Sequence, residues 1–454
     1  MPAGTLPGVT TTPDLHRPSG LLGRLVGPIP PSLFAVLVGT FTLRFSTGLT
    51  GAMIVYYLAN LPRHGGPTVE PVVIGMFAAS FFAAELIMST PFGLLADRLG
   101  HRLIMQLGPI FGLVAVVITY FTSNLVVIGA TRVLEGLSAA ASVPAILGFI
   151  AAITAGDELL RGRAAARFEG ATLAGLGFGL VAAGPVYNAI GRTGFLLNAV
   201  FYGISFLIYR YGVPREPVQP RVLGATHPGR ARYIAILRSP SVWLLAPTWI
   251  AINAALGLWT SQSIFQLVRA PEPRFAGQWL MGHFGSLAIS AGLAVGLIVF
   301  FIGLAFWGER FRTYRRTTII FYGILGGAAV VLAGAAVNHS GGLPHLARLV
   351  EGAVVIGGLF VLAGATPAAL GMLADVSEAF PADRGAIMGL YSVFLAVGQI
   401  VGSLIGGVAG QVRGIDGILV ATLLLLGIAL VPLRRLRDVE HLLAGDSAAG
   451  STSP

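Results

Sequence analysis

The sequence predicts an all-α membrane protein with twelve transmembrane helices, arranged as two pseudo-symmetric six-helix bundles. The 454-residue chain is 55% hydrophobic and only 11% charged, whereas soluble domains average about 25% charged residues. Apolar runs of about 18 residues or more, each long enough to cross a bilayer as a helix, recur along its length. A third observation, the similarity between the two halves of the chain, predicts the pair of bundles.

Twelve apolar runs qualify as membrane spans, with ends placed to within a few residues. Because twelve is an even number, both termini are expected on the same side of the membrane. The predicted spans cover residues 33–60, 71–92, 103–122, 125–154, 171–190, 194–213, 241–268, 278–307, 318–337, 345–373, 386–410 and 415–436.

The distribution of arginine orients these spans. The chain has no lysine, so arginine supplies all 29 basic residues. Three arginines lie within spans, five lie in segments on the far side, and the remaining 21 lie on the side of both termini. Cytoplasmic segments are enriched in basic residues, which predicts a multi-pass cell-membrane protein with both termini in the cytoplasm. The net charge of +10 is therefore interpreted as a topology signal, and no nucleic acid is expected as a partner.

The same topology predicts five regions along the chain. Residues 1–32 are rich in Pro, Gly and Thr and lack the apolar core of a signal peptide, so they are predicted to form a cytoplasmic tail. A six-helix bundle over 33–213 is followed by a Pro-rich cytoplasmic linker over 214–240. A second bundle over 241–436 and a cytoplasmic tail over 437–454 complete the chain.

Two motifs recur in the same order in both halves. Arg132-x-x-Glu135-Gly136, in the fourth span, returns 216 residues later as RLVEG at 348–352, in the tenth. Asp97-Arg98, after the second span, returns 212 residues later as Glu-Arg at 309–310, after the eighth. Duplicated bundles of this kind are typical of secondary transporters, which bind substrate near the membrane midplane between the repeats.

The loop after the second span carries a family resemblance. GLLADRLGHR at 93–102 resembles the signature Gly-x-Leu-Ala-Asp-Arg-x-Gly-Arg-Arg of the major facilitator superfamily, and only His101 departs at a position that is usually basic. With the span layout and the repeat, the resemblance covers about residues 33–436. It implies a transporter that works by alternating access of its two halves.

A second motif in the fourth span resembles the same family. RVLEGLSAA, from Arg132, is similar to Arg-x-x-Gln-Gly-x-Gly-Ala-Ala, with Glu135 in place of glutamine and Ser138 in place of glycine. In the family this arginine is associated with proton coupling. The glycine-rich fifth-helix pattern of antiporters is only partly present in 170–188, with irregular spacing, and leaves the direction of transport open.

The resemblance implies a cytoplasmic gate built from the second-span loop and its repeat. In this hypothesis Gly93 lets a helix of the other half pack closely, and charged pairs at helix ends hold the cytoplasmic side closed in one state. The alternative is that these charges only stop transfer and orient the spans. The candidate gate residues are Gly93, Asp97, Arg98, Gly100, Arg102, Glu309 and Arg310.

Two pairs of charged residues are expected inside the membrane. Arg44 lies about 18 Å deep in the first span at 1.5 Å per residue, near the midplane, and Glu85 lies at a compatible depth in the second span. We expect these two side chains to form a buried ion pair, with either a functional or a structural role.

Arg132 and Glu135 are three residues apart and therefore share one face of their helix. Three interpretations remain open for them: an internal salt bridge, a proton-coupling site in which the arginine controls the proton affinity of the carboxylate, and direct substrate binding. Arg348 and Glu351 are their counterparts in the repeat.

Few polar side chains are available to face a substrate. Aromatic rings with sparse polar groups suit an apolar or amphipathic ligand, although Trp and Tyr near span ends also form interfacial belts. The candidates are Trp249, Asn253, Trp259 and Gln262 in the seventh span, with Tyr391 and Gln399 in the eleventh.

The sequence predicts no enzyme, no cofactor and no metal site, because it lacks cysteine, paired-histidine metal motifs, nucleophile motifs and a lysine-containing phosphate loop. The leading hypothesis is proton-coupled efflux of a small apolar or amphipathic compound by a monomer, whose partners are the substrate, protons and the lipid bilayer. The alternative is uptake or facilitated transport of a small organic anion, with Arg44 binding the carboxylate. A membrane receptor or an intramembrane enzyme is the hypothesis from another class.

Overall fold

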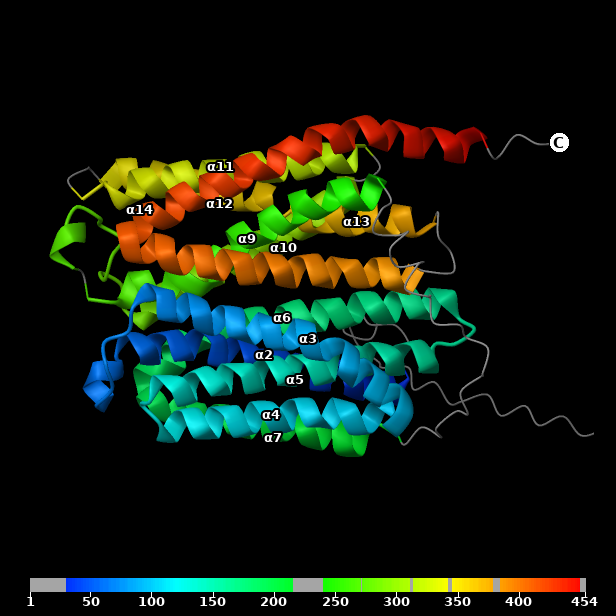
Figure 1. The fold of residues 1–454 in the computed structure, drawn as a ribbon, viewed down its shortest axis with the longest axis horizontal. Helices are drawn as coiled ribbons and strands as arrows, with labels where there is room; N and C mark the ends of the chain where they lie inside the picture. Colours follow the sequence, from blue (N-terminus) through cyan, green and yellow to red (C-terminus); the bar gives the residue numbers. More distant parts are fainter. Residues whose placement is uncertain are drawn as a thin grey trace, which may run out of the picture.

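The computed structural model describes residues 30–214 and 240–449, apart from 271, 311–312, 342–344 and 379–383. Within these ranges the chain is helical, and the helices run side by side along the long axis of the molecule (Figure 1). The predicted tail 1–32 and linker 214–240 lie almost entirely outside the described residues.

The helices fall into two groups along the sequence. The first comprises α2 (Pro31–Ala59), α3 (Pro71–Leu99), α4 (His101–Phe121), α5 (Leu125–Ile153), α6 (Glu158–Ile190) and α7 (Gly194–Gly212). The second comprises α9 (Pro240–Val268), α10 (Ser286–Glu309), α11 (Arg316–Asn338), α12 (His345–Leu362), α13 (Ala365–Glu378) and α14 (Arg384–Ala449). Three short 3-10 turns join them: η1 (Leu61–His64), η2 (Gly191–Thr193) and η3 (Pro273–Phe275).

The predicted all-α membrane fold is confirmed. In the described ranges, nine stretches are long and apolar enough to cross a membrane, and two of them, Leu160–Gly212 and Ser392–Asp438, each hold two predicted spans. The helix α14 is two helices joined at Gly414, whose φ of 59° belongs to the left-handed region that glycine tolerates. With α9 as the seventh span, every predicted span corresponds to a helix.

Three boundaries differ from the sequence prediction. The tenth span is interrupted between α12 and α13, shortly before Pro367, which lacks the N–H that a helix interior needs and is tolerated in a first turn. The eighth span begins at Ser286 because residues 273–285 form a loop that contains η3. The last helix continues to Ala449, so the predicted tail over 437–454 is helical as far as that residue.

Local sequence explains where several helices begin. The Asn124 side chain accepts hydrogen bonds from the backbone N–H groups of the first turn of α5, and Asp157 does the same for α6. Pro31 and Pro71 occupy the first positions of α2 and α3, where no intrahelical N–H is required. Gly100, with φ of 95°, makes the tight turn from α3 into α4.

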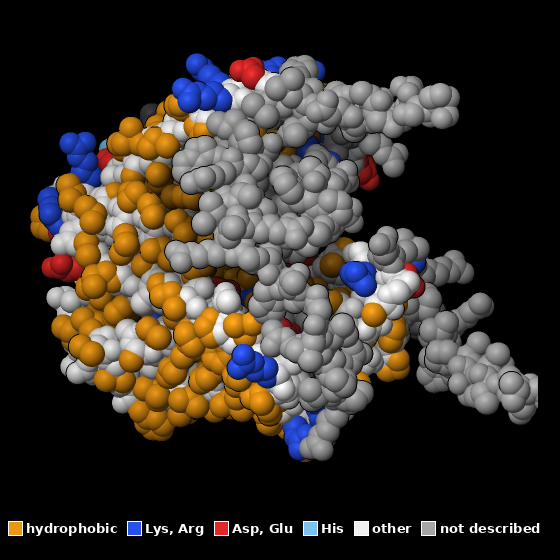
Figure 2. Space-filling view, turned by 45° about the vertical axis from the view of Figure 1, so that its right-hand side comes forward, with side chains coloured by type: hydrophobic (Ala, Val, Ile, Leu, Met, Phe, Trp, Pro, Cys, Tyr) orange, Lys and Arg blue, Asp and Glu red, His pale blue; other side chains and the backbone are white. Residues whose placement is uncertain are grey.

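The two groups of helices form two layers (Figure 1). In the first layer, α2 packs against α6 and α7 while α5 packs against α3 and α4; in the second, α9 packs against α14 and α11 against α12. The layers meet mainly where α3 contacts α14 and α6 contacts α10. Hydrophobic side chains cover much of the flank seen in Figure 2, and arginine side chains gather in separate patches on that view.

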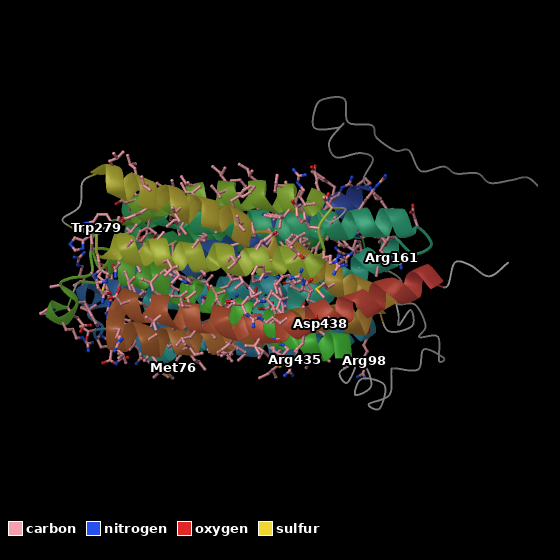
Figure 3. All side chains as sticks on the ribbon, turned by 90° about the horizontal axis from the view of Figure 1, so that it is seen from above. Met76, Arg98, Arg161, Trp279, Arg435 and Asp438 are labelled. Atoms are coloured by element: carbon pink, nitrogen blue, oxygen red, sulfur yellow. The ribbon has the colours of Figure 1, made fainter. Side chains whose placement is uncertain are left out.

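Labelled residues distinguish the two ends of the molecule in Figure 3. We call one the Trp279 end, which holds the turns at 60–70, 191–193 and 269–285, and the other the Arg98 end, which also holds Arg161, Arg435 and Asp438. At the Trp279 end, Gln278 accepts a hydrogen bond from the Ile415 N–H at 2.8 Å and donates one to the Arg413 carbonyl at 2.8 Å. The loop between α9 and α10 is thereby fixed to the bend of α14.

Gly402 sets the distance between α9 and α14. A Cβ on Gly402 would lie 1.9 Å from the Ala254 carbonyl oxygen, so an alanine there forces two backbones apart. We predict that Gly402→Ala lowers the free energy of unfolding by about 1–3 kcal/mol, measured as a lower melting temperature of the detergent-purified protein. Gly292→Ala is the matched control on α10, where a Cβ would meet nothing within 4 Å. Equal melting temperatures for both variants would contradict the close contact.

Candidate functional site: buried charges and a one-ended seal

A buried ion pair lies two to three turns into α5. Arg132 Nη1 is 2.5 Å from Glu135 Oε2, and the two residues are 8% and 1% exposed. Helix α3 approaches closely here, because a Cβ on Gly136 would lie 2.3 Å from the Phe81 carbonyl oxygen. That approach places the Phe81 ring against the arginine, with 5.2 Å between the guanidinium carbon and the ring centroid, a favourable cation–π distance. The sequence prediction that the two charges share a face and pair is therefore met in the geometry.

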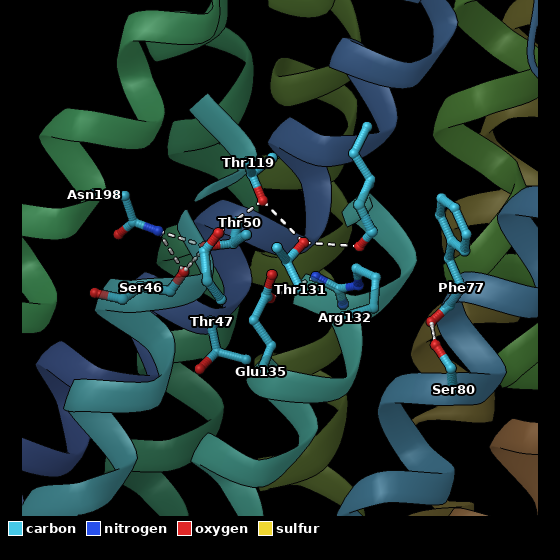
Figure 4. A network of polar contacts seen from close by, with 12 residues as sticks. Ser46, Thr47, Thr50, Phe77, Ser80, Thr119, Thr131, Arg132, Glu135 and Asn198 are labelled. Atoms are coloured by element: carbon cyan, nitrogen blue, oxygen red, sulfur yellow. Dashed lines mark hydrogen bonds and ion pairs between the residues drawn. The ribbon is translucent and has the colours of Figure 1, made fainter. Parts of the chain in front are cut away.

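Glu135 has unused bonding capacity. Its Oε2 is bonded to Arg132, whereas its buried Oε1 has no hydrogen-bond partner among the described residues. The neighbouring turn is polar: the Thr131 hydroxyl lies 3.0 Å from that of Thr119 on α4 (Figure 4). A carboxylate oxygen without a partner is costly in a membrane interior, so this atom is a place where a proton or a moving donor would be favourable.

Polar groups continue from this pair along the contact between α2 and α7. Asn198 donates hydrogen bonds to the Ser46 carbonyl at 2.9 Å and to the Thr50 hydroxyl at 2.5 Å (Figure 4). Ser205, two turns later on the same face of α7, donates to the Gly39 carbonyl at 3.0 Å. All of these side chains are fully buried. The first layer therefore encloses a polar interior around Glu135 rather than a purely apolar core.

Arg44 lies deep in the first layer, 9% exposed, on α2. Gly175 makes room for it, because a Cβ there would lie 2.8 Å from the Arg44 Cβ. In the part of the chain that the structure describes, Arg44 forms no direct ion pair with Glu85, in contrast to the predicted contact. Its charge instead acts at longer range on two carboxylates, Glu85 of α3 and Glu169 of α6.

Glu169 was missed by the sequence reasoning. It lies two residues before the predicted start of the fifth span and therefore resembled an ordinary flanking charge. Helix α6 begins at Glu158, so Glu169 is about three turns inside the helix. The signal that could have found it is the continuous helical pattern upstream of the apolar run.

The candidate substrate residues of the second layer lie mainly between α9 and α14. Asn253, 2% exposed, donates to the Trp249 carbonyl at 2.9 Å on its own helix. Trp259 Nε1 donates to the Thr422 hydroxyl at 2.9 Å, and the Gln399 side-chain oxygen accepts from Thr260 at 3.3 Å. In this conformation these groups join the two helices, and their assignment to a substrate cavity stays a prediction. The side chains of Tyr391 and Arg348 lie outside the described part.

Gln262 has a different role. Its Nε2 donates to the Pro71 carbonyl at 3.0 Å and so joins α9 to the first turn of α3. Gln411 of α14 donates to Glu70 Oε2 at 2.8 Å, and Gly184 N–H of α6 donates to the Ser290 hydroxyl of α10 at 3.1 Å. These three hydrogen bonds cross from one layer to the other, and all of them lie toward the Trp279 end.

Glycines bring the layers into backbone contact at the same end. A Cβ on Gly75 of α3 would lie 2.3 Å from the Ser403 carbonyl oxygen and 3.1 Å from the Gly407 Cα of α14. A Cβ on Gly184 would lie 2.2 Å from the Ser286 carbonyl oxygen of α10. We call these contacts, with the three hydrogen bonds, the Trp279-end seal. Small residues permit such approaches between membrane helices.

A buried arginine flanks the seal. Arg269, just beyond α9 and 8% exposed, pairs with Glu272 at 3.1 Å and lies 5.6 Å from the Phe275 ring centroid. Burial lowers the pKa of Arg269, and the neighbouring carboxylate of Glu272 opposes that effect. In the sequence it counted only as one of the five arginines on the far side of the membrane.

Two of the predicted gate residues, Asp97 and Arg102, pair within the first layer at the Arg98 end. Asp97 is exposed and lies 3.6 Å from His101, and Arg102 donates to the Arg210 carbonyl. Among the described residues, a Cβ on Gly93 would meet only Pro144 of α5, at 3.5 Å, and no helix of the second layer. The expectation that Gly93 seats a helix of the other half is not met in this conformation, because α5 already occupies its face. Arg98, Gly100, Glu309 and Arg310 likewise lie at this end.

The comparisons with known proteins agree with this architecture. Quinolone resistance protein NorA of Staphylococcus aureus is 22% identical over 379 residues, which cover 83% of this chain and 89% of NorA. An uncharacterized MFS-type transporter of Methanocaldococcus jannaschii is 26% identical over 182 residues, 40% of this chain and 44% of that protein.

Solved structures confirm the fold. The crystal structure of the nucleoside transporter NupG superposes with a TM-score of 0.67 at 14% identity, over 90% of this chain and 98% of NupG. A point mutant of NupG gives a TM-score of 0.68 at 13% identity. The family model for the Major Facilitator Superfamily matches residues 36–340. This chain belongs to the Major Facilitator Superfamily: it is a multi-pass membrane transporter and not an enzyme.

Proposed function

We propose that this protein exports a small apolar or amphipathic compound in exchange for protons. The observation that carries the proposal is Glu135, a carboxylate buried inside a membrane-spanning helix with one oxygen on Arg132 and the other without a partner in the described chain. The similarity to NorA, a quinolone resistance protein, supports export of drug-like compounds.

The Glu135 carboxylate can be neutralised in two ways. An unpaired carboxylate in the membrane interior costs several kcal/mol, so Glu135 requires either the guanidinium of Arg132 or a proton. If Arg132 moves away, a proton becomes the remaining way to neutralise the carboxylate. Proton binding is thereby linked to the position of one arginine side chain.

Helix α3 connects this switch to the seal. Its first turn carries Pro71 and Gly75 against α9 and α14, and about two turns later Phe81 lies against Arg132. A movement of α3 that separates the layers at the Trp279 end also moves the Phe81 ring. Opening of the seal and release of Arg132 from Glu135 are therefore coupled in the proposal through one rigid helix.

The orientation follows from arginine content. The Arg98 end carries most of the arginines, so it faces the cytoplasm in the proposal, with the Trp279-end seal on the outer side. The described conformation is then closed to the outside, and the described contacts of Asp97 and Arg102 lie within the first layer.

The alternative, transport of an organic anion on Arg44, receives less support. Two carboxylates, Glu85 and Glu169, are already within electrostatic range of Arg44. A third anion beside this buried arginine would add to their negative charge.

We predict that Glu135→Gln abolishes proton-driven accumulation but preserves substrate binding. Glutamine keeps the shape and an acceptor for Arg132 but cannot take up a proton. In inside-out vesicles, a gradient of one pH unit supplies about 1.4 kcal/mol per proton and thus about tenfold accumulation for one-to-one exchange. The accumulation is measured as the ratio of a fluorescent quinolone inside the vesicles to that outside. We expect a ratio near one for the variant and near ten for the parent.

Two controls separate coupling from structure. Glu169→Gln changes the accessible carboxylate near Arg44, and we expect it to retain accumulation. A purely structural ion pair gives a different pattern, in which Glu135→Gln loses folded protein and Glu135→Gln/Arg132→Ala restores it. Accumulation that persists in folded Glu135→Gln would eliminate Glu135 as the proton carrier.

A second prediction concerns the seal. We expect Gly75→Leu to separate α3 from α14 and to expose Ser290, now 3% exposed. The chain has no cysteine, so Ser290→Cys is the single thiol, and it reports on the contact between α6 and α10 in the same seal. Its reaction with a membrane-impermeant maleimide should accelerate about tenfold or more, an equilibrium shift of roughly 1.4 kcal/mol. Gly203→Leu, in open space on α7, is the matched control and should leave the rate unchanged.

The orientation has its own test with two matched glycines. Gly277 lies in a turn at the Trp279 end and Gly162 near the start of α6 at the Arg98 end, both with open space at the Cβ position. In intact cells, an impermeant maleimide should label Gly277→Cys and spare Gly162→Cys until the cells are broken. Labelling of Gly162→Cys alone in intact cells would reverse the topology.

A further inference from the structure

A groove runs along the crossing of α11 and α12. A Cβ on Gly358 would lie 2.7 Å from the Gly326 carbonyl oxygen, and one on Gly326 would lie 2.6 Å from that of Gly358. The two backbones touch, and neither glycine has a side chain to fill the space beside the contact. The result is a cavity of about 520 Å³ with apolar walls that include Leu325 and Val354.

The groove opens on the flank of the second layer. Its helices pack against each other and against α10, α13 and α14 (Figure 1), and Leu325 and Val354 are 47% and 45% exposed. In a membrane-spanning chain this flank faces lipid hydrocarbon. Tyr322 and Ala329, seven residues apart on α11, give the groove a length of about 10 Å, which suits part of an acyl chain.

Aromatic rings close the groove toward the Arg98 end. Trp307 and Tyr322 line it with ring centroids 6.3 Å apart, and the Trp307 Nε1 is occupied by the Phe360 carbonyl at 3.1 Å. Trp and Tyr are the residues that concentrate at the boundary between hydrocarbon and headgroups. The end of the groove therefore lies where a phospholipid passes from its acyl chains to its headgroup.

Positive charge lies directly beyond these rings. The Arg310 guanidinium carbon lies 4.7 Å from the centroid of Phe306, whose ring is 5.4 Å from that of Trp307. Arg310 and Arg315 are both exposed, and Glu309 is the acid beside them. Arg310 was expected in the cytoplasmic gate, but its described contact is with a ring of its own helix.

We propose that this groove binds one acyl chain of an anionic phospholipid, whose phosphate is held by Arg310 and Arg315. Guanidinium groups bind phosphate through paired N–H donors, and juxtamembrane basic residues attract anionic lipid. The apolar groove recognises the acyl chain of the phospholipid, and the arginines recognise its phosphate. The proposal is independent of transport, because it requires neither proton coupling nor the seal.

Trp307 provides a direct probe of this site. The full-length protein is placed in bilayers that contain phosphatidylglycerol and phosphatidylcholine, with bromine on the acyl chains of one or the other, since bromine quenches tryptophan fluorescence on contact. The Trp307 signal is the difference between the parent and Trp307→Phe. We expect brominated phosphatidylglycerol to quench it several-fold more than the same fraction of brominated phosphatidylcholine.

Two glycines of α12 offer a matched pair of variants. Gly357 lines the groove and Gly352 does not, and a Cβ on either would meet nothing within 4 Å. Gly357→Phe should fill the groove and remove most of the quenching, whereas Gly352→Phe should leave it unchanged. Ala329→Leu, from the opposite wall, serves as a second filling variant where Gly357→Phe does not fold.

The double variant Arg310→Gln/Arg315→Gln tests whether these arginines bind the lipid phosphate. We expect this variant to lose the preference for phosphatidylglycerol and to retain the lower quenching by phosphatidylcholine. Equal quenching of the parent by both lipids overturns the phosphate site, and unchanged quenching in both groove-filling variants overturns the acyl-chain site.

Discussion

The structure depends on backbone contact between helices at glycine. Membrane helices gain no hydrophobic free energy from leaving lipid for one another, so close packing has to supply their association. Gly136 brings α3 against α5, Gly175 brings α6 against α2, and Gly75 brings α3 against α14. Each contact also positions part of the candidate site: Phe81 against Arg132, the stem of Arg44, and the seal. In the proposed function, packing and transport therefore use the same residues.

The charges in the first layer follow a consistent rule. Arg132 has a carboxylate on its own helix and an aromatic ring from the next, while Arg44 has two carboxylates at longer range. Neither cation is left without compensation, as the low dielectric of the membrane requires. This difference in distance matters. A small side-chain movement is enough to break the direct contact of Arg132 with Glu135, whereas the longer-range interactions of Arg44 change only when helices move.

The fold was largely predictable from the sequence because length and composition decide which segments cross a membrane. The helices match the predicted spans except at ends set by specific chemistry, such as the interruption before Pro367. Contacts between residues of a single helix were also predictable, as the ion pair of Arg132 and Glu135 demonstrates. Contacts between helices were not: the face of Gly93 turned to α5, and Gln262 bonded to Pro71. Spacing along one helix does not specify which neighbour it meets.

The two ends of the molecule carry groups that interact over different distances, and this difference bears on how the layers separate. The Trp279-end seal consists of glycine contacts and amide or hydroxyl hydrogen bonds, with Glu70 as an acceptor at its exposed margin. Such contacts are short-ranged, so the attraction is lost within a small displacement. Charges at the Arg98 end act over longer distances but are screened by salt. A seal of short-range contacts favours two discrete positions over a gradual opening, and in the proposed function α3 transmits that all-or-none change to Arg132.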